Sequence, residues 1–165
     1  MTSILKVSSI QDPQNSNTAL SIDTSGRVTT PQRPAFSATF SGDNTIGNMD
    51  VVVDVLLNVG NCFDSDTGAF TCPVDGVYSF SADVMTSATG GTSYHTWKFT
   101  VNGTAKGSLH HSTSDSGDSY RNTSGSIILS LSANDVVRVN TQQSPPYGNG
   151  TSGTGWSSFS GYLVG

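Results

Sequence analysis

The sequence predicts an all-β protein, built as a sandwich or barrel of short strands. Only 12% of its 165 residues are charged, about half the ~25% that is usual for soluble domains. From residue 34 onward, short apolar segments recur between turn-forming residues, as in sandwiches and barrels. Between Asn58 and Phe80, aromatic residues at strand spacing are interleaved with glycines typical of turns. A chain of this length accommodates one ordinary domain and a short appendage.

The appendage is expected to be residues 1–33, and the main domain residues 34–165. Pro31 and Pro34 remove two backbone donors and fix two φ angles, which predicts an extended connector. Before the connector, the pattern reads as a strand, a turn with Gly26 at a positive-φ site, and a second strand. A hairpin this small is barely stable alone, so it is expected to lie against the main domain, a sister chain or a larger assembly. Its apolar residues are the predicted anchor: Ile4, Leu5, Val7, Ile10, Leu20, Ile22 and Val28.

The main domain is expected to consist of strands alone. The predicted strands cover residues 35–40, 51–59, 62–63, 69–72, 76–85, 95–101, 126–131, 136–140 and 156–164. Period-two alternation places three sets of side chains on inward faces: Tyr78, Phe80, Ala82 and Val84; Trp97, Phe99 and Val101; Ile127, Leu129 and Leu131.

Cys62 and Cys72 flank a predicted hairpin turn at residues 65–68, so a disulfide across the hairpin is one possibility. Alternation argues against it. If Phe63 and Phe70 both face the core, Cys62 points outward and Cys72 inward, whereas a disulfide needs Cβ atoms about 4 Å apart. Free thiols are favoured, and a β-bulge would be needed to bring the pair together.

Four ordered motifs of the main domain resemble a known family. They are the aromatic signature from Asn58 to Phe80, the run Phe-Thr-Cys-Pro-Val-Asp-Gly-Val-Tyr-Ser-Phe over residues 70–80, the pattern Leu129-x-Leu131-x-x-x-Asp135-x-Val137, and the closing Phe-Ser-Gly-Tyr-Leu over residues 159–163. This set resembles the globular-head jelly roll of complement C1q and its tumour-necrosis-factor relatives.

The sequence departs from the family pattern at three positions. Val52 stands where the family usually has phenylalanine, and Asn134 replaces a turn glycine, which is benign because asparagine tolerates left-handed geometry. Ala82 stands where a second aromatic is favoured, in a strand near the family's three-fold contact, so a neighbour must fill the gap.

The resemblance implies a homotrimer that displays its loops at one end. Residues 51–59 are apolar on both faces, which indicates a strand buried once in the core and once beneath another sheet or protomer; the alternative is an ordinary central strand. The residues expected to form the core and pack the trimer are Phe36, Phe63, Phe70, Tyr78, Phe80, Leu129, Leu131, Phe159 and Tyr162.

Residues 3–12 and 18–28 are similar to the openings of tail-fibre and other virion-surface proteins of marine bacteriophages. The chain starts without the basic and apolar regions of a secretion signal, and it carries no collagen-like Gly-x-y stalk. The expected setting is therefore a virion surface, with synthesis in the host cytoplasm.

The composition argues against several partners and activities. The formal net charge is -5 without a Lys/Arg cluster, whereas nucleic acids and anionic membranes need a concentrated basic patch. No apolar run approaches the ~20 residues that span a bilayer. Gly-x-Ser-x-Gly, His-Glu-x-x-His, phosphate-loop and Cys-x-x-Cys motifs are absent, so no catalytic residue is predicted and an enzyme is not expected.

No cofactor or metal site is expected, with calcium as the one open possibility. The three histidines, His95, His110 and His111, lack a further ligand at helpful spacing. Asp64-Ser-Asp66 and Asp115-Ser-Gly-Asp118 offer oxygen ligands, and members of the resembled family often carry calcium near their loops. Neither segment completes a calcium loop, and turn-forming aspartates are the better interpretation. The sequons that begin at Asn102, Asn122 and Asn149 are likewise interpreted as turns.

Two long predicted loops, residues 109–122 and 142–155, are the candidate recognition elements, because long loops on a rigid sandwich are where binding usually resides. Aromatic rings there could stack on sugars while amides and hydroxyls donate and accept hydrogen bonds. The candidate receptor-binding residues are Tyr147, Trp156, Tyr120, Arg121, His110 and His111.

The leading hypothesis is a non-enzymatic, trimeric virion-surface protein of the tail-fibre or adhesin type, which contacts other virion proteins through residues 1–33 and presents its head to a host glycan or protein. One alternative is a capsid decoration or cement protein, or a head fibre, that stabilises the shell. A further alternative is a C1q-like recognition module of a cellular organism.

Overall fold

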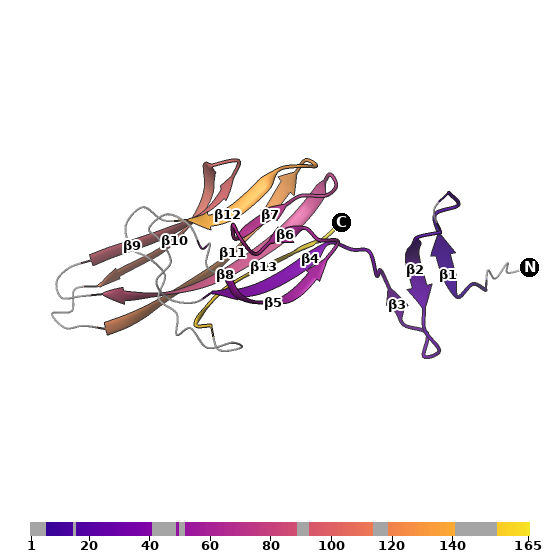
Figure 1. The fold of residues 1–165 in the computed structure, drawn as a ribbon, viewed down its shortest axis with the longest axis horizontal. Coiled ribbons are helices and arrows are strands. Elements are labelled where there is room, and N and C mark those ends of the chain that lie inside the picture. The colour runs from indigo at the N-terminus through magenta and orange to yellow at the C-terminus, as the bar shows by residue number, and fades with distance from the viewer. Residues whose placement is uncertain are drawn as a thin grey trace, which may run out of the picture. The chain divides into compact units, whose positions relative to one another are not determined.

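The computed structural model describes residues 6–14, 16–40, 49, 52–88, 93–113, 119–140 and 155–165. Within these residues the regular structure consists of β-strands and includes no helix (Figure 1). The chain separates into two compact units, Met1–Arg33 and Pro34–Gly165.

The first unit is a three-stranded antiparallel sheet. Its strands β1 (Ser9–Gln11), β2 (Thr18–Ile22) and β3 (Val28–Thr29) lie in the order β1-β2-β3, so β1 adds a third strand to the predicted hairpin. Gly26 has a φ of 79° in the turn between β2 and β3. The carboxylate of Asp23 closes this turn, accepting hydrogen bonds from the backbone N–H of Ser25 at 2.8 Å and of Arg27 at 2.9 Å.

The second unit is a sandwich of two five-stranded antiparallel sheets that face each other (Figure 1). One sheet has the order β10-β9-β12-β7-β6 and the other the order β11-β8-β13-β4-β5. This arrangement confirms the predicted jelly-roll sandwich. Its strands are β4 (Ala35–Phe40), β5 (Val52–Val59), β6 (Phe63–Asp64), β7 (Ala69–Thr71), β8 (Gly76–Ala88), β9 (Ser93–Val101), β10 (Thr104–Thr113), β11 (Ser119–Leu131), β12 (Val136–Asn140) and β13 (Ser157–Leu163).

The core between the sheets is dominated by aromatic rings. Phe36 lies at its centre, with ring centroids 4.7 Å from Phe63, 5.2 Å from Phe70 and 4.8 Å from Phe159. Stacked and edge-to-face pairs of this kind add about 0.5–1.5 kcal/mol each beyond the burial of area. Of the other predicted core residues, Tyr78 and Phe80 are fully buried, and Leu131 is 6% exposed.

Two of the residues expected in the core lie elsewhere. Leu129 is only partly buried and packs against the edge of the core. Tyr162 is 51% exposed, because β13 buries its odd-numbered residues between Ser157 and Gly161, and Tyr162 has the opposite parity.

The neighbour that fills the space near Ala82 is Leu109. Ala82 faces the interior and is 2% exposed, with Gly125 as its register partner on β11. A Cβ at Gly125 would collide with the side chain of Leu109, which reaches over from the opposite sheet. The absence of a side chain at Gly125 therefore makes room for Leu109 in the core beside Ala82.

The predicted long loop at residues 109–122 is wrong, because most of it is strand. β10 extends to Thr113 in register with β9, and β11 begins at Ser119 in register with β8. Asn122, interpreted as a turn residue, pairs with Met85 within β11. The segment is rich in Ser, Thr and His, so it lacks the apolar alternation that marks a strand. Its residues are strands because they pair with β9 and β8.

Both cysteines are free thiols, as expected, but Cys62 does not point outward. It is 4% exposed, and Cys72 is fully buried. β6 begins only at Phe63, and Asn61 before it has a φ of 49°, so strand alternation does not extend to Cys62. Its Sγ donates to the carbonyl of Val59 at 3.2 Å, and burial raises the pKa of both thiols.

The interpretation of residues 51–59 as an ordinary central strand is also wrong. β5 is the edge strand next to β4, and its consecutive residues Val55, Leu56 and Leu57 are all exposed in the single chain. No described side chain of β5 is fully buried, so the expected burial of one side of this strand in the core is not observed either. In one copy of the protein the strand is open on both sides at residues 55–57.

The turns at one end of the sandwich are tied together by Asn102 and Asp135. Asn102 has a φ of 51° and Gly103 of 79°, which confirms the predicted Asn-Gly turn. Asn134 has a φ of 71°, so it adopts the left-handed geometry of the glycine it replaces. The Asp135 carboxylate accepts from the backbone N–H of Ser132 at 2.9 Å and from Asn102 Nδ2 at 2.7 Å.

These contacts predict a loss of stability in acid. Hydrogen bonds from the Ser132 backbone and the Asn102 side chain lower the pKa of Asp135 in the folded protein. The ionised carboxylate therefore stabilises the folded state above the unfolded pKa of about 3.9. This stabilisation disappears as pH falls through the lower folded pKa. The free energy of unfolding should therefore decline below about pH 4, as measured by urea titration at several pH values. Asp135→Asn should reduce both the stability at pH 7 and the acid dependence; an unchanged acid dependence in this variant would contradict the assignment.

Candidate functional site

The outward face of the sheet β11-β8-β13-β4-β5 carries several exposed apolar side chains. The register places Ile128 of β11 and Tyr162 of β13 on either side of Ser79 of β8. Ile128 is 68% exposed and Tyr162 51% exposed. Val77, two residues before Ser79 on the same face, is also exposed. We call Val77, Ile128 and Tyr162 the outer-face patch.

The edge strand extends the apolar character of this sheet. Tyr162 pairs with Ala35 and Ala35 pairs with Val59, so the row that holds the outer-face patch ends on β5. Leu56, on the same strand, is 62% exposed. An open apolar surface that runs from a sheet face to its edge is typical of a protein interface.

The next row across the sheet is made of serines. Ser126 pairs with Ser81, Ser81 with Ser160, and Ser160 with Ser37. Because serine side chains project only a short distance from the sheet, a partner surface can approach the backbone closely along this row. The serine hydroxyls can form hydrogen bonds.

A third row contains two carboxylates, but it does not form a catalytic pair. Asp83 pairs with Ser158, Ser158 with Thr39, and Thr39 with Asp54. The two aspartates are therefore three strand spacings apart, about 14 Å, whereas paired carboxylates in glycoside hydrolysis lie roughly 5–10 Å apart. Asp83 Oδ1 and Thr39 Oγ1 are covered and have no hydrogen-bond partner, so this row is better suited to contact than to acid–base chemistry.

The predicted receptor-binding residues are only partly described. Trp156 lies just before β13 and is 42% exposed. The backbones of His110 and His111 belong to β10, and those of Tyr120 and Arg121 belong to β11. His111 is the register partner of His95 on β9. Tyr147 lies outside the described residues.

The aspartates considered as calcium ligands form turns where they are described. Asp64 Oδ1 accepts from the backbone N–H of Asp66 at 2.8 Å, and Oδ2 accepts from the Thr67 hydroxyl at 2.7 Å. The Thr67 hydroxyl and the Asp66 backbone lower the pKa of the Asp64 carboxyl. Among the described residues, no group of three or more His, Cys, Asp or Glu side chains could hold a metal ion. Asp115 and Asp118 lie outside these residues.

The predicted anchor residues occupy the first unit. Ile10 is 50% exposed and Val28 is 59% exposed, Val7 is exposed, and Leu20 and Ile22 are half-buried. Ile4 and Leu5 lie outside the described residues. In the described part of the chain no helix is long and apolar enough to cross a membrane.

Sequence reasoning missed Ile128 and Val77. Ile128 is adjacent to Ile127, and two consecutive isoleucines break strict alternation, so one of them must face outward. That break is the signal by which the outer-face patch could have been found.

Comparison with known proteins agrees with this architecture. Residues 35–164 match the family model described as C1q domain. The chain is 30% identical over 139 residues to a complement C1q subcomponent of Mus musculus and, at the same identity and length, to the corresponding subcomponent of Rattus norvegicus. Each match covers 80% of this chain and 52% of the relative, so the chain spans about half the length of the curated relatives it matches.

A solved structure shares the fold. The globular domain of zebrafish complement 1qA protein superposes with a TM-score of 0.56 at 24% identity, covering 81% of this chain and 98% of that chain. The family model covers most of the chain and lies entirely within the sandwich of the second unit. The chain therefore belongs to the C1q domain family.

Proposed function

We propose that this chain is a non-enzymatic recognition protein in which three C1q-like heads associate through the outer-face patch and present their loop end to a glycan or protein on a host surface. We further propose that the assembly stands on the surface of a bacteriophage virion, where residues 1–33 connect it to other virion proteins. The observation that carries the proposal is an open apolar surface, from the outer-face patch to β5, on a C1q domain.

Burial arithmetic supports association through this surface. Ile128, Tyr162 and Leu56 are each more than half exposed in a single chain. Fully burying a large aliphatic side chain contributes about 1.5–3 kcal/mol, and each copy in a three-fold assembly can offer and receive such contacts. The serine row beside the patch lets the neighbouring surface approach closely.

Recognition is assigned to the opposite end of the strands from the Asn102 and Asn134 turns. Trp156, which is 42% exposed, offers the flat apolar surface on which a sugar ring can stack. Three heads in one assembly would bind a multivalent surface more tightly than one head, because linked sites rebind at high effective concentration.

The proposed virion setting rests on the similarity of residues 3–12 and 18–28 to the openings of virion-surface proteins. The described residues of the first unit form a small three-stranded sheet, and in this proposal that sheet connects the head to the particle.

Ile128→Asp tests the association. Ile128 is largely exposed in one chain, so the head should still fold, while a charge at a buried interface should prevent assembly. Light scattering should give the mass of a single chain for Ile128→Asp. Ser108→Asp, which adds the same charge to an exposed position on the other sheet, should keep the mass of the unmodified protein. Equal masses for all three proteins would contradict the proposed surface.

Trp156→Ala tests recognition. On an array of host glycans, binding of the assembled protein should fall by about tenfold or more, while Trp156→Phe should retain most of it because the aromatic face is kept. Unchanged binding by Trp156→Ala would remove this residue from the receptor site.

Particle fractionation tests the setting. In a density gradient of a lysate from cells that produce the protein during infection, the chain should migrate with intact particles. Recovery only among free proteins would contradict a virion role.

A further inference from the structure

One face of the three-stranded sheet in the first unit is apolar. The register pairs Ile10 with Leu20 and Ile22 with Val28. Leu20 and Ile22 are two residues apart on β2, so alternation places all four side chains on the same side of the sheet. We call Ile10, Leu20, Ile22 and Val28 the apolar face.

The opposite face is polar. Ser21 pairs with Ser9 on one side and with Thr29 on the other, and the hydroxyls of Ser21 and Thr29 lie 2.6 Å apart. The sheet is therefore amphipathic, with one side suited to water and one suited to a partner.

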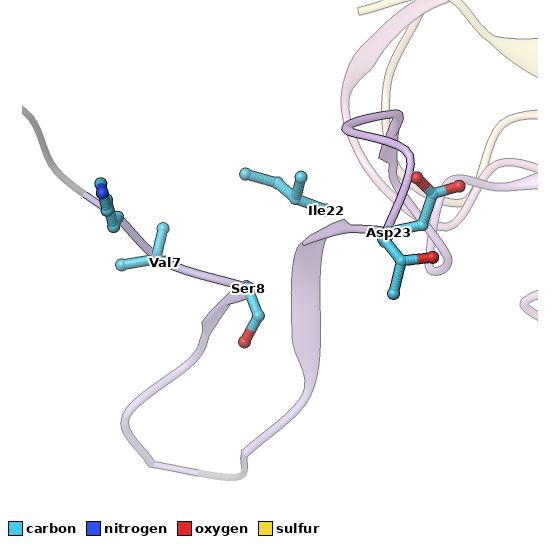
Figure 2. A pocket seen from close by; sticks show the side chains of 6 residues that line it. Val7, Ser8, Ile22 and Asp23 are labelled. Carbon is cyan, nitrogen blue, oxygen red and sulfur yellow. The ribbon is translucent and has the colours of Figure 1, made fainter.

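Nothing described in the first unit covers the apolar face. Ile10 and Val28 are at least half exposed, and none of the described side chains before Pro34 is fully buried. An open recess of about 550 Å³ lies beside β2, lined in part by Val7 and Ile22. Figure 2 shows the side chain of Ile22 projecting toward the Val7 side of this recess, while the carboxylate of Asp23 turns away from it. A sheet without its own core needs a partner to be stable.

The size of the face decides what that partner can be. Four partly exposed aliphatic side chains offer on the order of 300 Å² per sheet, well below the ~800 Å² per partner of a standard stable interface. Such a small area does not offset the loss of translational and rotational freedom of a free partner. It is sufficient only for a partner that is already held nearby, at the millimolar effective concentrations that linkage provides.

Charge permits that partner to be another copy of the same sheet. Residues 1–33 contain three cationic side chains and two carboxylates, and one pair of these is already joined in the ion pair between Arg27 Nε and Asp23 Oδ2 at 2.6 Å. The apolar face itself carries no charged residue. The formal charge of these residues is therefore only +1 per copy, so repulsion between identical sheets is weak, although the chain as a whole has a formal net charge of -5.

We propose that the apolar face packs against the same face of sister copies, so that the sheets of the first unit form a shared apolar core in the assembled protein. This inference rests on the proposed association of three heads, which supplies the linkage.

Crosslinking between chains, through one cysteine added to β3, tests the inference. The cysteine is placed either on the apolar face, at position 28, or on the opposite face, at position 29. Full-length Val28→Cys and Thr29→Cys proteins are treated with a short bismaleimide and run on a denaturing gel, and their masses are measured by light scattering. Both positions are exposed in a single chain, so neither change should disturb the fold. The unmodified protein is the blank, because Cys62 and Cys72 are buried and should react slowly.

Val28→Cys should give about tenfold more two-chain product than Thr29→Cys, since linked thiols on a shared face react at high effective concentration. Suppose that light scattering gives the mass of three chains. Equal crosslinking yields from the two variants, or no product from Val28→Cys, would then overturn the inference and leave the association of heads intact. The mass of a single chain for the unmodified protein would overturn both.

Discussion

Replacing Phe36 with alanine is expected to lower the free energy of unfolding of the head by about 3–5 kcal/mol. Phe36 is 2% exposed, and its ring stacks on Phe63 and Phe70 and meets Phe159 edge-on. Removing it deletes the contact between rings from both sheets and leaves a cavity that the surrounding strands cannot close. Urea denaturation followed by tryptophan fluorescence measures the loss.

Phe36→Leu is the matched control, because leucine keeps most of the buried volume while it removes the aromatic stacking. This variant should lose clearly less stability than Phe36→Ala. A change of less than about 1 kcal/mol for Phe36→Ala would be below the range for buried phenylalanines and would contradict the central position of this ring.

Replacing Gly161 with alanine is expected to destabilise the head by about 1–3 kcal/mol through overpacking. A Cβ at this position would lie 2.8 Å from Phe80 Cε1 and 2.9 Å from Phe36 Cε1, with Phe80 Cδ1 closer still. Gly161 is the register partner of both Phe80 and Phe36, so the two rings from neighbouring strands close over it. Both rings are themselves packed on all sides, and neither can give way without moving the core.

Gly165→Ala provides the control for this substitution. The same methyl group added there meets no atom within 4 Å, so the stability should stay within about 0.5 kcal/mol of the unmodified protein. If Gly161→Ala were as stable as Gly165→Ala in urea titrations, the close approach of the two rings to the backbone would be wrong.

The all-β class and most of the strands of the head could be predicted from the sequence, because apolar alternation is strong where one face is buried. Tyr78, Phe80, Ala82 and Val84 were expected on one face of β8, and all four are buried. The aromatic motif and the turn residues add independent signals at Asn102 and Asn134, whose positive φ angles follow from the tolerance of asparagine for that geometry.

The strand bounds and the strand order that could not be predicted depend on which strands pair with each other, and not on the local sequence pattern. β10, apart from Leu109, and the first half of β11 are largely polar, so their pairing with β9 and β8 defines them better than local pattern does. The position of Cys62 depends on where β6 begins, which alternation alone does not determine. The edge position of β5 follows from strand order, and strand order is set by the packing of the whole sandwich.

The candidate site was predicted less completely than the fold. Tyr162 was expected in the core or between protomers; its exposure contradicts the first expectation, and the second stays a prediction. Ile128 and Val77 were not identified, because their role depends on the register that places them around Ser79. The consecutive isoleucines Ile127 and Ile128 indicate that one of them faces outward, but they do not specify the register.

Light scattering of the full-length protein in solution is the most direct test of the proposal that the heads associate through the outer face of the sheet β11-β8-β13-β4-β5. The account predicts a mass three times the 17.2 kDa of one chain. A mass of 17.2 kDa that persists at high protein concentration would contradict it.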